Sequence, residues 1–236
     1  MKLKELESRL QEVNTFKKPK LQLEQYITTP HLASQIVFNI DQLYDDLRGK
    51  KICDLGCGTG MLSIACSFME SDFILGIDID SEAIKTCKEN IESFQINNID
   101  LIQMDCEKTL QSVGKNEKLL SFFNRFDTVI MNPPFGTKGF TKKSNSSEDG
   151  DELNSLGMDM KFLKLASLLT NKSIYSIHKS VTRDFIERKS KKWGLKMEVV
   201  SELKYDIPKI ENRNRKLEKE ASLKDVYVDL LRFTKI

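Results

Sequence analysis

The chain has 236 residues, of which 39% are hydrophobic and 31% are charged. This length and composition are typical of one globular domain with a buried core, and no apolar run is long enough to span a membrane. A net charge of +2 does not by itself require a nucleic-acid partner, and five cysteines without a Cys-x-x-Cys pair exclude a disulfide scaffold and a zinc knuckle.

Two helices are predicted at the start of the chain, as an N-terminal extension over residues 1–48. The first covers residues 3–14, where leucines and a valine recur at helical spacing. The second begins at Pro30 with Thr29 as its cap, because proline suits a first helical turn and threonine can accept the free N–H groups. A basic stretch with a proline, residues 17–20, separates the two helices.

From Lys51 onward the sequence alternates between short apolar strands and amphipathic helices. Strands are predicted at 51–54, 73–77, 101–104, 126–131, 173–177, 195–205 and 226–234. Helices are predicted at 61–69, 160–169 and 182–193, and Ser81 is expected to cap another. Such repeated units form a mostly parallel, doubly wound sheet, and the last two strands indicate one antiparallel strand. We expect a single α/β domain over residues 1–236, with mobile loops at 141–156 and 208–224.

A glycine-rich loop follows the first strand of this alternating region. It reads Asp54-Leu55-Gly56-Cys57-Gly58-Thr59-Gly60, and its glycines let the backbone approach a ligand closely. A dinucleotide fold would show Gly-x-Gly-x-x-Gly instead. The spacing found here resembles the loop that binds S-adenosyl-L-methionine, beside a crevice at the carboxyl ends of the strands.

Acidic residues end the next two strands. Asp78 is placed to accept both ribose hydroxyls of a nucleoside, a feature shared by NAD and S-adenosyl-L-methionine sites. Asp80 is interpreted as a helix cap. Asp105 is placed to bind the adenine amino group of the cofactor. The alternative interpretation is that Asp105 is a cap at the end of the strand.

The fourth strand ends in Asn132-Pro133-Pro134-Phe135, a signature of methyltransferases that act on planar amino groups. The Asn132 side chain and the Pro133 carbonyl can accept the two N–H groups of an adenine amine, so that the nitrogen lone pair points at a methyl donor. The prolines fix these acceptors in place, and Phe135 offers a face for base stacking. A zinc deaminase would need His-x-Glu and paired cysteines, which are absent, and no metal is expected.

Other chemistry-bearing residues allow ordinary structural interpretations. His31 and His178 have no nucleophile nearby in sequence, so a catalytic histidine is disfavoured. The basic residues between Lys179 and Lys192 could contact RNA phosphates, but a solvated helix face is favoured on charge alone. Free cysteines in apolar segments indicate a reducing compartment.

Taken together, these motifs resemble those of the methyltransferase-like protein 5 family, which methylates an adenine of small-subunit rRNA. The resemblance covers nearly the whole chain, from residues 3–10 through Asp78-Ile79-Asp80 to the final strand. The string from Asp127 to Lys138 is its most specific part. Longer 141–156 and 208–224 segments depart from the family, as does Thr59, where the family commonly has cysteine.

The resemblance implies a Rossmann-like class I methyltransferase that uses S-adenosyl-L-methionine to form N6-methyladenosine in 18S rRNA, with Asn132–Phe135 as the catalytic motif. It also implies a small activator subunit as a heterodimer partner, no membrane association, and a location in nucleus and cytoplasm. The residues that it implies around the cofactor are Gln25, Thr28, Gly56, Thr59, Met61, Asp78, Asp105 and Cys106.

Two other functions stay open. A glutamine-amide methyltransferase of release factors uses a similar motif, usually with tyrosine in the place of Phe135. A non-catalytic rRNA-binding assembly factor is the second alternative, disfavoured by the intact motifs. The activator is expected at the third strand, which the class I strand order places at a sheet edge, unless the helix at 3–14 folds over that edge.

Overall fold

The computed structural model describes residues 1–113, 123–135, 153, 155–207 and 224–236. The predicted loops at 141–156 and 208–224 lie outside these ranges, except for residues 153, 155, 156 and 224. A second basic cluster of the sequence, formed by Arg213, Arg215 and Lys216, also lies outside these ranges.

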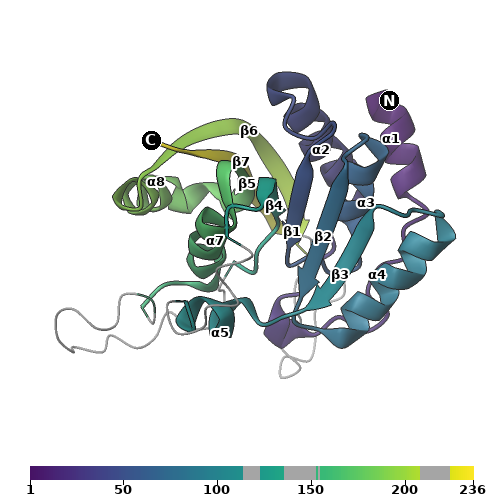
Figure 1. Cartoon of the computed structure of the whole chain (residues 1–236), viewed down its shortest axis with the longest axis horizontal. Coiled ribbons are helices and arrows are strands. Elements are labelled where there is room, and N and C mark those ends of the chain that lie inside the picture. Colours follow the sequence, from purple (N-terminus) through teal and green to yellow (C-terminus); the bar gives the residue numbers. More distant parts are fainter. Residues whose placement is uncertain (114–122, 136–152, 154, 208–223) are drawn as a thin grey trace.

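Seven strands form one sheet in the order β3-β2-β1-β4-β5-β7-β6 (Figure 1). Neighbouring strands run parallel from β3 to β5, whereas β7 runs antiparallel to both β5 and β6. The mostly parallel sheet with one antiparallel strand is therefore confirmed. The strands are β1 (Lys51–Leu55), β2 (Phe73–Asp78), β3 (Ile99–Gln103), β4 (Phe126–Met131), β5 (Thr170–Lys179), β6 (Leu195–Ile207) and β7 (Lys224–Lys235).

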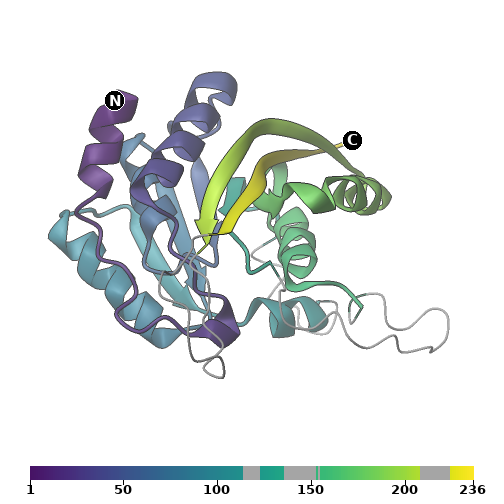
Figure 2. The ribbon, with the colours of Figure 1, turned by 180° about the vertical axis from the view of Figure 1, so that it is seen from behind.

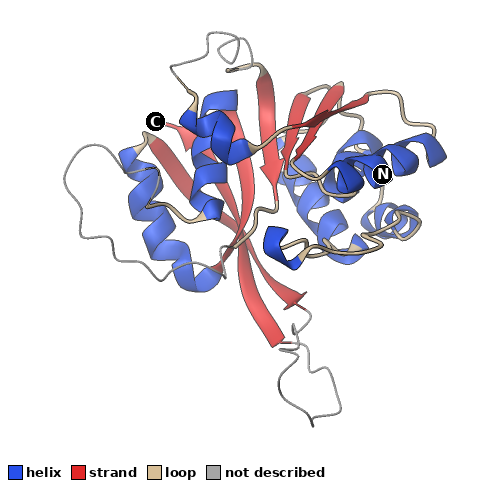
Figure 3. Ribbon diagram, turned by 90° about the horizontal axis from the view of Figure 1, so that it is seen from below, coloured by secondary structure: helices blue, strands red, loops and turns tan. Residues whose placement is uncertain are grey.

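Helices cover both faces of the sheet. One face is covered by α1 (Leu3–Leu10), α2 (Pro30–Tyr44), α3 (Met61–Phe68) and α4 (Ser81–Ser93), as seen from behind in Figure 2. The other face is covered by α5 (Cys106–Gln111), α7 (Met158–Leu169) and α8 (Arg183–Lys192). Short 3-10 helices occur at Leu21–Leu23 and Ser180–Thr182. Figure 3 shows the sheet between its two helical layers, with the β6–β7 pair extending beyond them.

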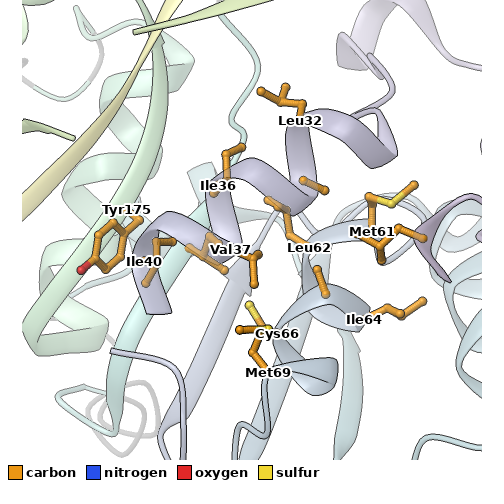
Figure 4. Close-up of a cluster of buried hydrophobic side chains, with 14 of the residues drawn as sticks. Leu32, Ile36, Val37, Ile40, Met61, Leu62, Ile64, Cys66, Met69 and Tyr175 are labelled. Carbon is orange, nitrogen blue, oxygen red and sulfur yellow. The ribbon is translucent and has the colours of Figure 1, made fainter. Parts of the chain in front are cut away.

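Alternation of buried side chains explains why both faces are covered. In β1, Ile52 packs into the core on the α1–α4 side, whereas Cys53 and Leu55 pack into the core on the opposite side. A strand buried on both faces reads as a continuous apolar run, as the sequence does here. On the first side, Ile36 and Ile40 of α2 are fully buried in the cluster drawn in Figure 4.

The helix starts confirm the predicted caps Thr29 and Asp80 and correct a third, Ser81. The Thr29 hydroxyl accepts the Leu32 N–H at 3.2 Å and begins α2 as predicted. Ser81 is not a cap, because the Asp80 carboxylate caps α4 by accepting the Glu82 N–H at 3.1 Å. Asp105 caps α5 in the same way. The first helix ends at Leu10, earlier than the predicted residue 14.

Strand β3 lies at one end of the sheet, as the class I order predicts. Helix α1 contacts α2 and α3 and does not fold over β3, so the proposed covering of that edge by the first helix is wrong. Of the helices that the structure describes, none has the length and apolar character needed to cross a membrane.

Candidate active site

A cavity of about 390 Å³ opens where the parallel strands end. Its wall includes Asp54 at the end of β1, Asp78 at the end of β2, Asp105 after β3 and Asn132 after β4. Ligand sites of open α/β sheets lie at this edge, and small-molecule pockets measure about 300–1,000 Å³. The cavity therefore has the position and size of a cofactor site.

All eight residues predicted to surround a cofactor line this one cavity. The catalytic motif divides, since Asn132 and Pro134 reach the wall while Pro133 and Phe135 are buried behind it. The lining cofactor-site residues are Gln25, Thr28, Gly56, Thr59, Met61, Asp78, Asp105 and Cys106. Their proximity to one another is a finding, whereas their contact with a cofactor stays a prediction.

The glycine loop turns sharply over the end of β1. Both Gly56 and Gly58 have positive φ angles, +80° and +56°, which glycine adopts without strain. A Cβ atom on Gly56 would lie 3.0 Å from the ring of Phe162, and one on Gly58 would lie 3.0 Å from the ring of Phe16. Both rings line the cavity, so a side chain at Gly56 or Gly58 would displace part of the cavity lining.

Asp78 stands beside the glycine loop and is held by backbone donors. Its carboxylate accepts the Gly58 N–H at 2.9 Å and the Asp80 N–H at 2.8 Å. Burial is the main reason that the pKa of Asp78 is raised, although these N–H donors oppose the shift. A carboxylate oxygen can accept more than one hydrogen bond. Both oxygens of Asp78 can therefore still accept a hydrogen bond from a hydroxyl group of a ligand in the cavity.

Asp54 is a site residue that sequence reasoning did not assign. Its side chain is 1% exposed, and the Ser63 hydroxyl donates to Oδ2 at 2.6 Å. The other oxygen, Oδ1, is buried without a hydrogen-bond partner. Burial raises the pKa of Asp54 to about 7, against the opposing effect of Ser63. The sequence did contain a signal for this role. An acid at the end of a strand that is covered on both faces is expected to be buried, and a buried carboxylate needs a partner such as a ligand.

At Asp105, the two predicted roles coexist. One carboxylate oxygen caps α5 by accepting the N–H groups of Glu107 and Lys108 at 3.0 and 3.1 Å. The residue also lines the cavity, so the cap does not exclude contact with a ligand. Next to it, burial raises the pKa of the Cys106 thiol to about 12, which keeps the thiol protonated at neutral pH.

Asn132 reaches the cavity directly after β4, where the prolines hold the chain in a fixed extended path. Its side-chain Nδ2 donates to the Thr28 hydroxyl at 3.0 Å. Phe135 is 8% exposed and packs into the core on the α1–α4 side. The ammonium group of Lys179, at the end of β5, lies 5.4 Å from the centre of the Phe135 ring. The ring that was expected to stack on a base is thus buried, lies outside the cavity lining and is bordered by a cation.

The segment between α1 and α2, residues 11–29, forms a strap over the cavity. It runs from α1 to the carboxyl edge of the sheet and back to α2 (Figure 2). Lys20 Nζ lies 2.5 Å and Gln25 Nε2 lies 2.6 Å from the two carboxylate oxygens of Asp80. Gln25 also accepts the Lys20 N–H at 2.7 Å. Burial raises the pKa of Asp80, but these donors outweigh it and the pKa is lowered.

Neither histidine reaches the cavity. His31 lies on the surface beside Glu7 at 3.1 Å, and His178 is fully buried between Ser176 at 2.8 Å and Asp159 at 3.4 Å. Since this Asp–His–Ser arrangement is closed to solvent at His178, it has no access to a substrate. Within the described residues, no group of three or more His, Cys, Asp or Glu side chains could hold a metal ion.

The basic residues between Lys179 and Lys192 fall into two groups. Lys179 ends β5 and Arg183 begins α8, whereas Lys189, Lys191 and Lys192 share the last turn of α8. That end adjoins the C-terminus, where the Ile236 N–H bonds to the Gly194 carbonyl at 3.0 Å. A helix of ten residues is about 15 Å long, so the last-turn lysines are remote from Asn132.

Comparison with known proteins gives consistent results. A protein-family model described as "Methyltransferase domain" matches residues 46–225. The chain is 42% identical to the rRNA N(6)-adenosine-methyltransferase METTL5 of Danio rerio, over 99% of both chains. It is 39% identical to the rRNA N(6)-adenosine-methyltransferase Mettl5 of Drosophila melanogaster, over 99% of this chain and 96% of that one. A crystal structure of a candidate RNA methyltransferase from Pyrococcus horikoshii superposes with a TM-score of 0.74, at 29% identity, covering 100% of this chain and 98% of that one.

Proposed function

Because the chain belongs to the family of rRNA N(6)-adenosine-methyltransferases, we propose that it transfers a methyl group from S-adenosyl-L-methionine to the exocyclic amino group of an adenine in small-subunit rRNA. The observation that carries this proposal is the position of Asn132. Its side chain borders the same cavity as the glycine loop and Asp78, so a donor and an acceptor group can meet there.

The described residues fit S-adenosyl-L-methionine. The unpartnered, buried Oδ1 of Asp54 suits the cationic amino group of the methionine part, and Asp78 suits the ribose hydroxyls. Gly56 and Gly58 let the loop turn with positive φ angles at the cavity wall, where the backbone can face the ligand. When bound, the cofactor supplies a reactive methyl group on a sulfonium. A dinucleotide is disfavoured because the loop lacks the Gly-x-Gly-x-x-Gly spacing.

The acceptor chemistry rests on Asn132 and Pro133. An adenine amino group is a weak nucleophile, because its lone pair is delocalised into the ring. Hydrogen bonds from its two N–H groups to the Asn132 Oδ1 and the Pro133 carbonyl favour a pyramidal nitrogen with a localised lone pair. These fixed acceptors stabilise charge that develops only during transfer, which is the contribution that raises a rate.

Bond making and proton loss then follow in order. The adenine nitrogen forms a bond to the methyl carbon as the carbon–sulfur bond breaks, and afterwards the nitrogen releases a proton to water. No covalent enzyme intermediate is needed. The neutral Cys106 thiol and the buried His178 are consistent with such a direct transfer, which depends mainly on positioning.

The last residue of the motif and a nearby cation favour RNA as the acceptor. Glutamine-amide methyltransferases usually have tyrosine where this chain has Phe135. The ammonium group of Lys179, 5.4 Å from the centre of the Phe135 ring, supplies a positive charge that suits a phosphate, which a glutamine acceptor lacks. Phe135 itself is buried in this structure, so base stacking on its ring would require the ring to become exposed.

We further propose that β3 receives a small activator subunit, as family resemblance implies, and that the enzyme works in nucleus and cytoplasm. Support for the partner comes from the edge position of β3, which helix α1 leaves uncovered. Half-buried Leu101 and Ile102 stand on that strand, and an edge strand with apolar side chains suits strand addition. A chain that is soluble, monomeric and fully active without a partner would contradict this part of the proposal.

The catalytic test is Asn132→Ala. We expect transfer to small-subunit rRNA to fall below about 1% of the wild-type rate, while calorimetry shows S-adenosyl-L-methionine binding within about threefold. Nucleoside mass spectrometry of the RNA identifies the product as N6-methyladenosine. A release-factor peptide, offered under the same conditions, distinguishes the glutamine acceptor. Near-normal turnover by the variant, or methylation of the peptide alone, would overturn the proposal.

A further inference from the structure

The catalytic amide is held from across the cavity by the strap. Asn132 follows β4, and the Thr28 hydroxyl that accepts its Nδ2–H at 3.0 Å stands 104 positions earlier in the chain. Both side chains are half-buried and both line the cavity. Among the described residues, this is the one side-chain hydrogen bond that Asn132 makes. It therefore helps to fix the orientation of the amide in this structure.

Thr28 is itself fixed on both sides. Directly after it, Thr29 caps α2 through hydrogen bonds to the Leu32 and Ala33 N–H groups, and α2 is anchored by residues that are almost fully buried. Before it, Gln25 is bound to the buried carboxylate of Asp80 at 2.6 Å. The Thr28 hydroxyl thus occupies a defined position rather than following a loose loop.

The two branches of a side-chain amide have opposite hydrogen-bonding character. With Nδ2 bound to Thr28, Oδ1 is left for a ligand, and an oxygen is what an incoming amino group requires. An amide that is not held by Thr28 is free to rotate, and rotation by 180° would present Nδ2 to the incoming amino group, so that donor would meet donor. Such a mismatch removes an acceptor that acts on the transferring nitrogen and leaves substrate binding elsewhere unchanged.

We propose that Thr28 is a positioning residue that holds the Asn132 amide in place beside the acceptor nitrogen, with Nδ2 bound to the hydroxyl and Oδ1 left for the ligand as in this structure. This inference rests on the proposed function of Asn132. It gives the strap a second role besides covering the cofactor cavity, because the segment that encloses the donor also prepares the group that receives the acceptor.

The test compares Thr28→Val, which keeps the shape and removes the hydroxyl, with Thr28→Ser, which keeps the hydroxyl. For Thr28→Val we expect kcat to fall about three- to tenfold, the worth of one neutral hydrogen bond. The KM for RNA should stay within about twofold, and any change in the calorimetric Kd for S-adenosyl-L-methionine, whose cavity Thr28 also lines, should be smaller than the loss in kcat. Thr28→Ser should recover most of the lost kcat. Thr15→Val, the same change on the strap away from the cavity wall, is the matched control.

Three outcomes overturn the assignment. They are an unchanged kcat in Thr28→Val, a loss confined to cofactor affinity, and a Thr28→Ser variant as slow as Thr28→Val. Melting temperatures equal to wild type establish that each variant is folded, and Thr28→Ala serves as the second hydroxyl-free variant if valine is not tolerated. Failure of the proposed function is separate, since it is read from the wild-type product and from Asn132→Ala.

Discussion

Asp54 provides a pH-dependent test of the cofactor site. Its carboxylate is buried, one oxygen lacks a partner, and burial raises its pKa to about 7. If the ionised form attracts the cationic amino group of S-adenosyl-L-methionine, binding is coupled to loss of this proton. The free protein then binds the cofactor weakly when Asp54 is protonated, and binding strengthens as the pH rises through about 7.

The size of the effect follows from that pKa. About one tenth of Asp54 is ionised at pH 6 and about nine tenths at pH 8, so the Kd should fall about tenfold between these values. The sign of the folding contribution is opposite. A carboxyl group with a raised pKa in the folded state costs stability as the pH rises from about 4 to about 7, and bound cofactor should offset this cost.

Calorimetric titrations at pH 6, 7 and 8 measure the effect in the wild type and in Asp54→Asn. The cofactor's own amino group titrates near pH 8, but this contribution is common to both proteins and cancels in their ratio. At pH 8, Asp54→Asn should bind S-adenosyl-L-methionine more weakly than the wild type does. The Kd of the variant should change little between pH 6 and pH 7. Ser63→Ala removes a hydrogen bond that lowers the Asp54 pKa, so it should shift the profile to higher pH. Equal pH dependence in wild type and Asp54→Asn would refute the reasoning.

Two further substitutions test the ribose site and the core. Asp78→Ala should weaken S-adenosyl-L-methionine binding about tenfold or more in calorimetry, while Asp72→Ala, an exposed acid just before the same strand, should not; equal Kd values would remove Asp78 from the site. Ile36→Ala, at a fully buried position of α2 in the cluster drawn in Figure 4, should lower the free energy of unfolding by about 2–5 kcal/mol in urea denaturation. Leu43→Ala on the same helix, where the side chain is 61% exposed, should cost less than about 1 kcal/mol, and similar losses in both would contradict the assigned packing.

Much of the architecture could be predicted because its signals are local. Strands buried on both faces appear as apolar runs, and glycines with an acid before them mark the loop after β1. The motif that ends β4 carries its chemistry in four adjacent residues. Parallel strands align their carboxyl ends, so Asp78, Asp105 and Asn132 could be expected at one edge before any coordinates were known. Capping was less certain, since Ser81 and Asp80 are adjacent and both suit the role.

What only the tertiary structure decided involves residues far apart in the chain. The bond between Thr28 and Asn132 and the contacts of Lys20 and Gln25 with Asp80 depend on how the strap crosses the sheet edge. The burial of the unpartnered Asp54 oxygen depends on how the elements pack around the end of β1. Likewise, the length of α8 separates its last-turn lysines from Lys179 at the end of β5, which composition alone does not reveal. Local periodicity determines which face of an element is buried, whereas the partner of a single polar atom depends on the packing of elements distant in sequence.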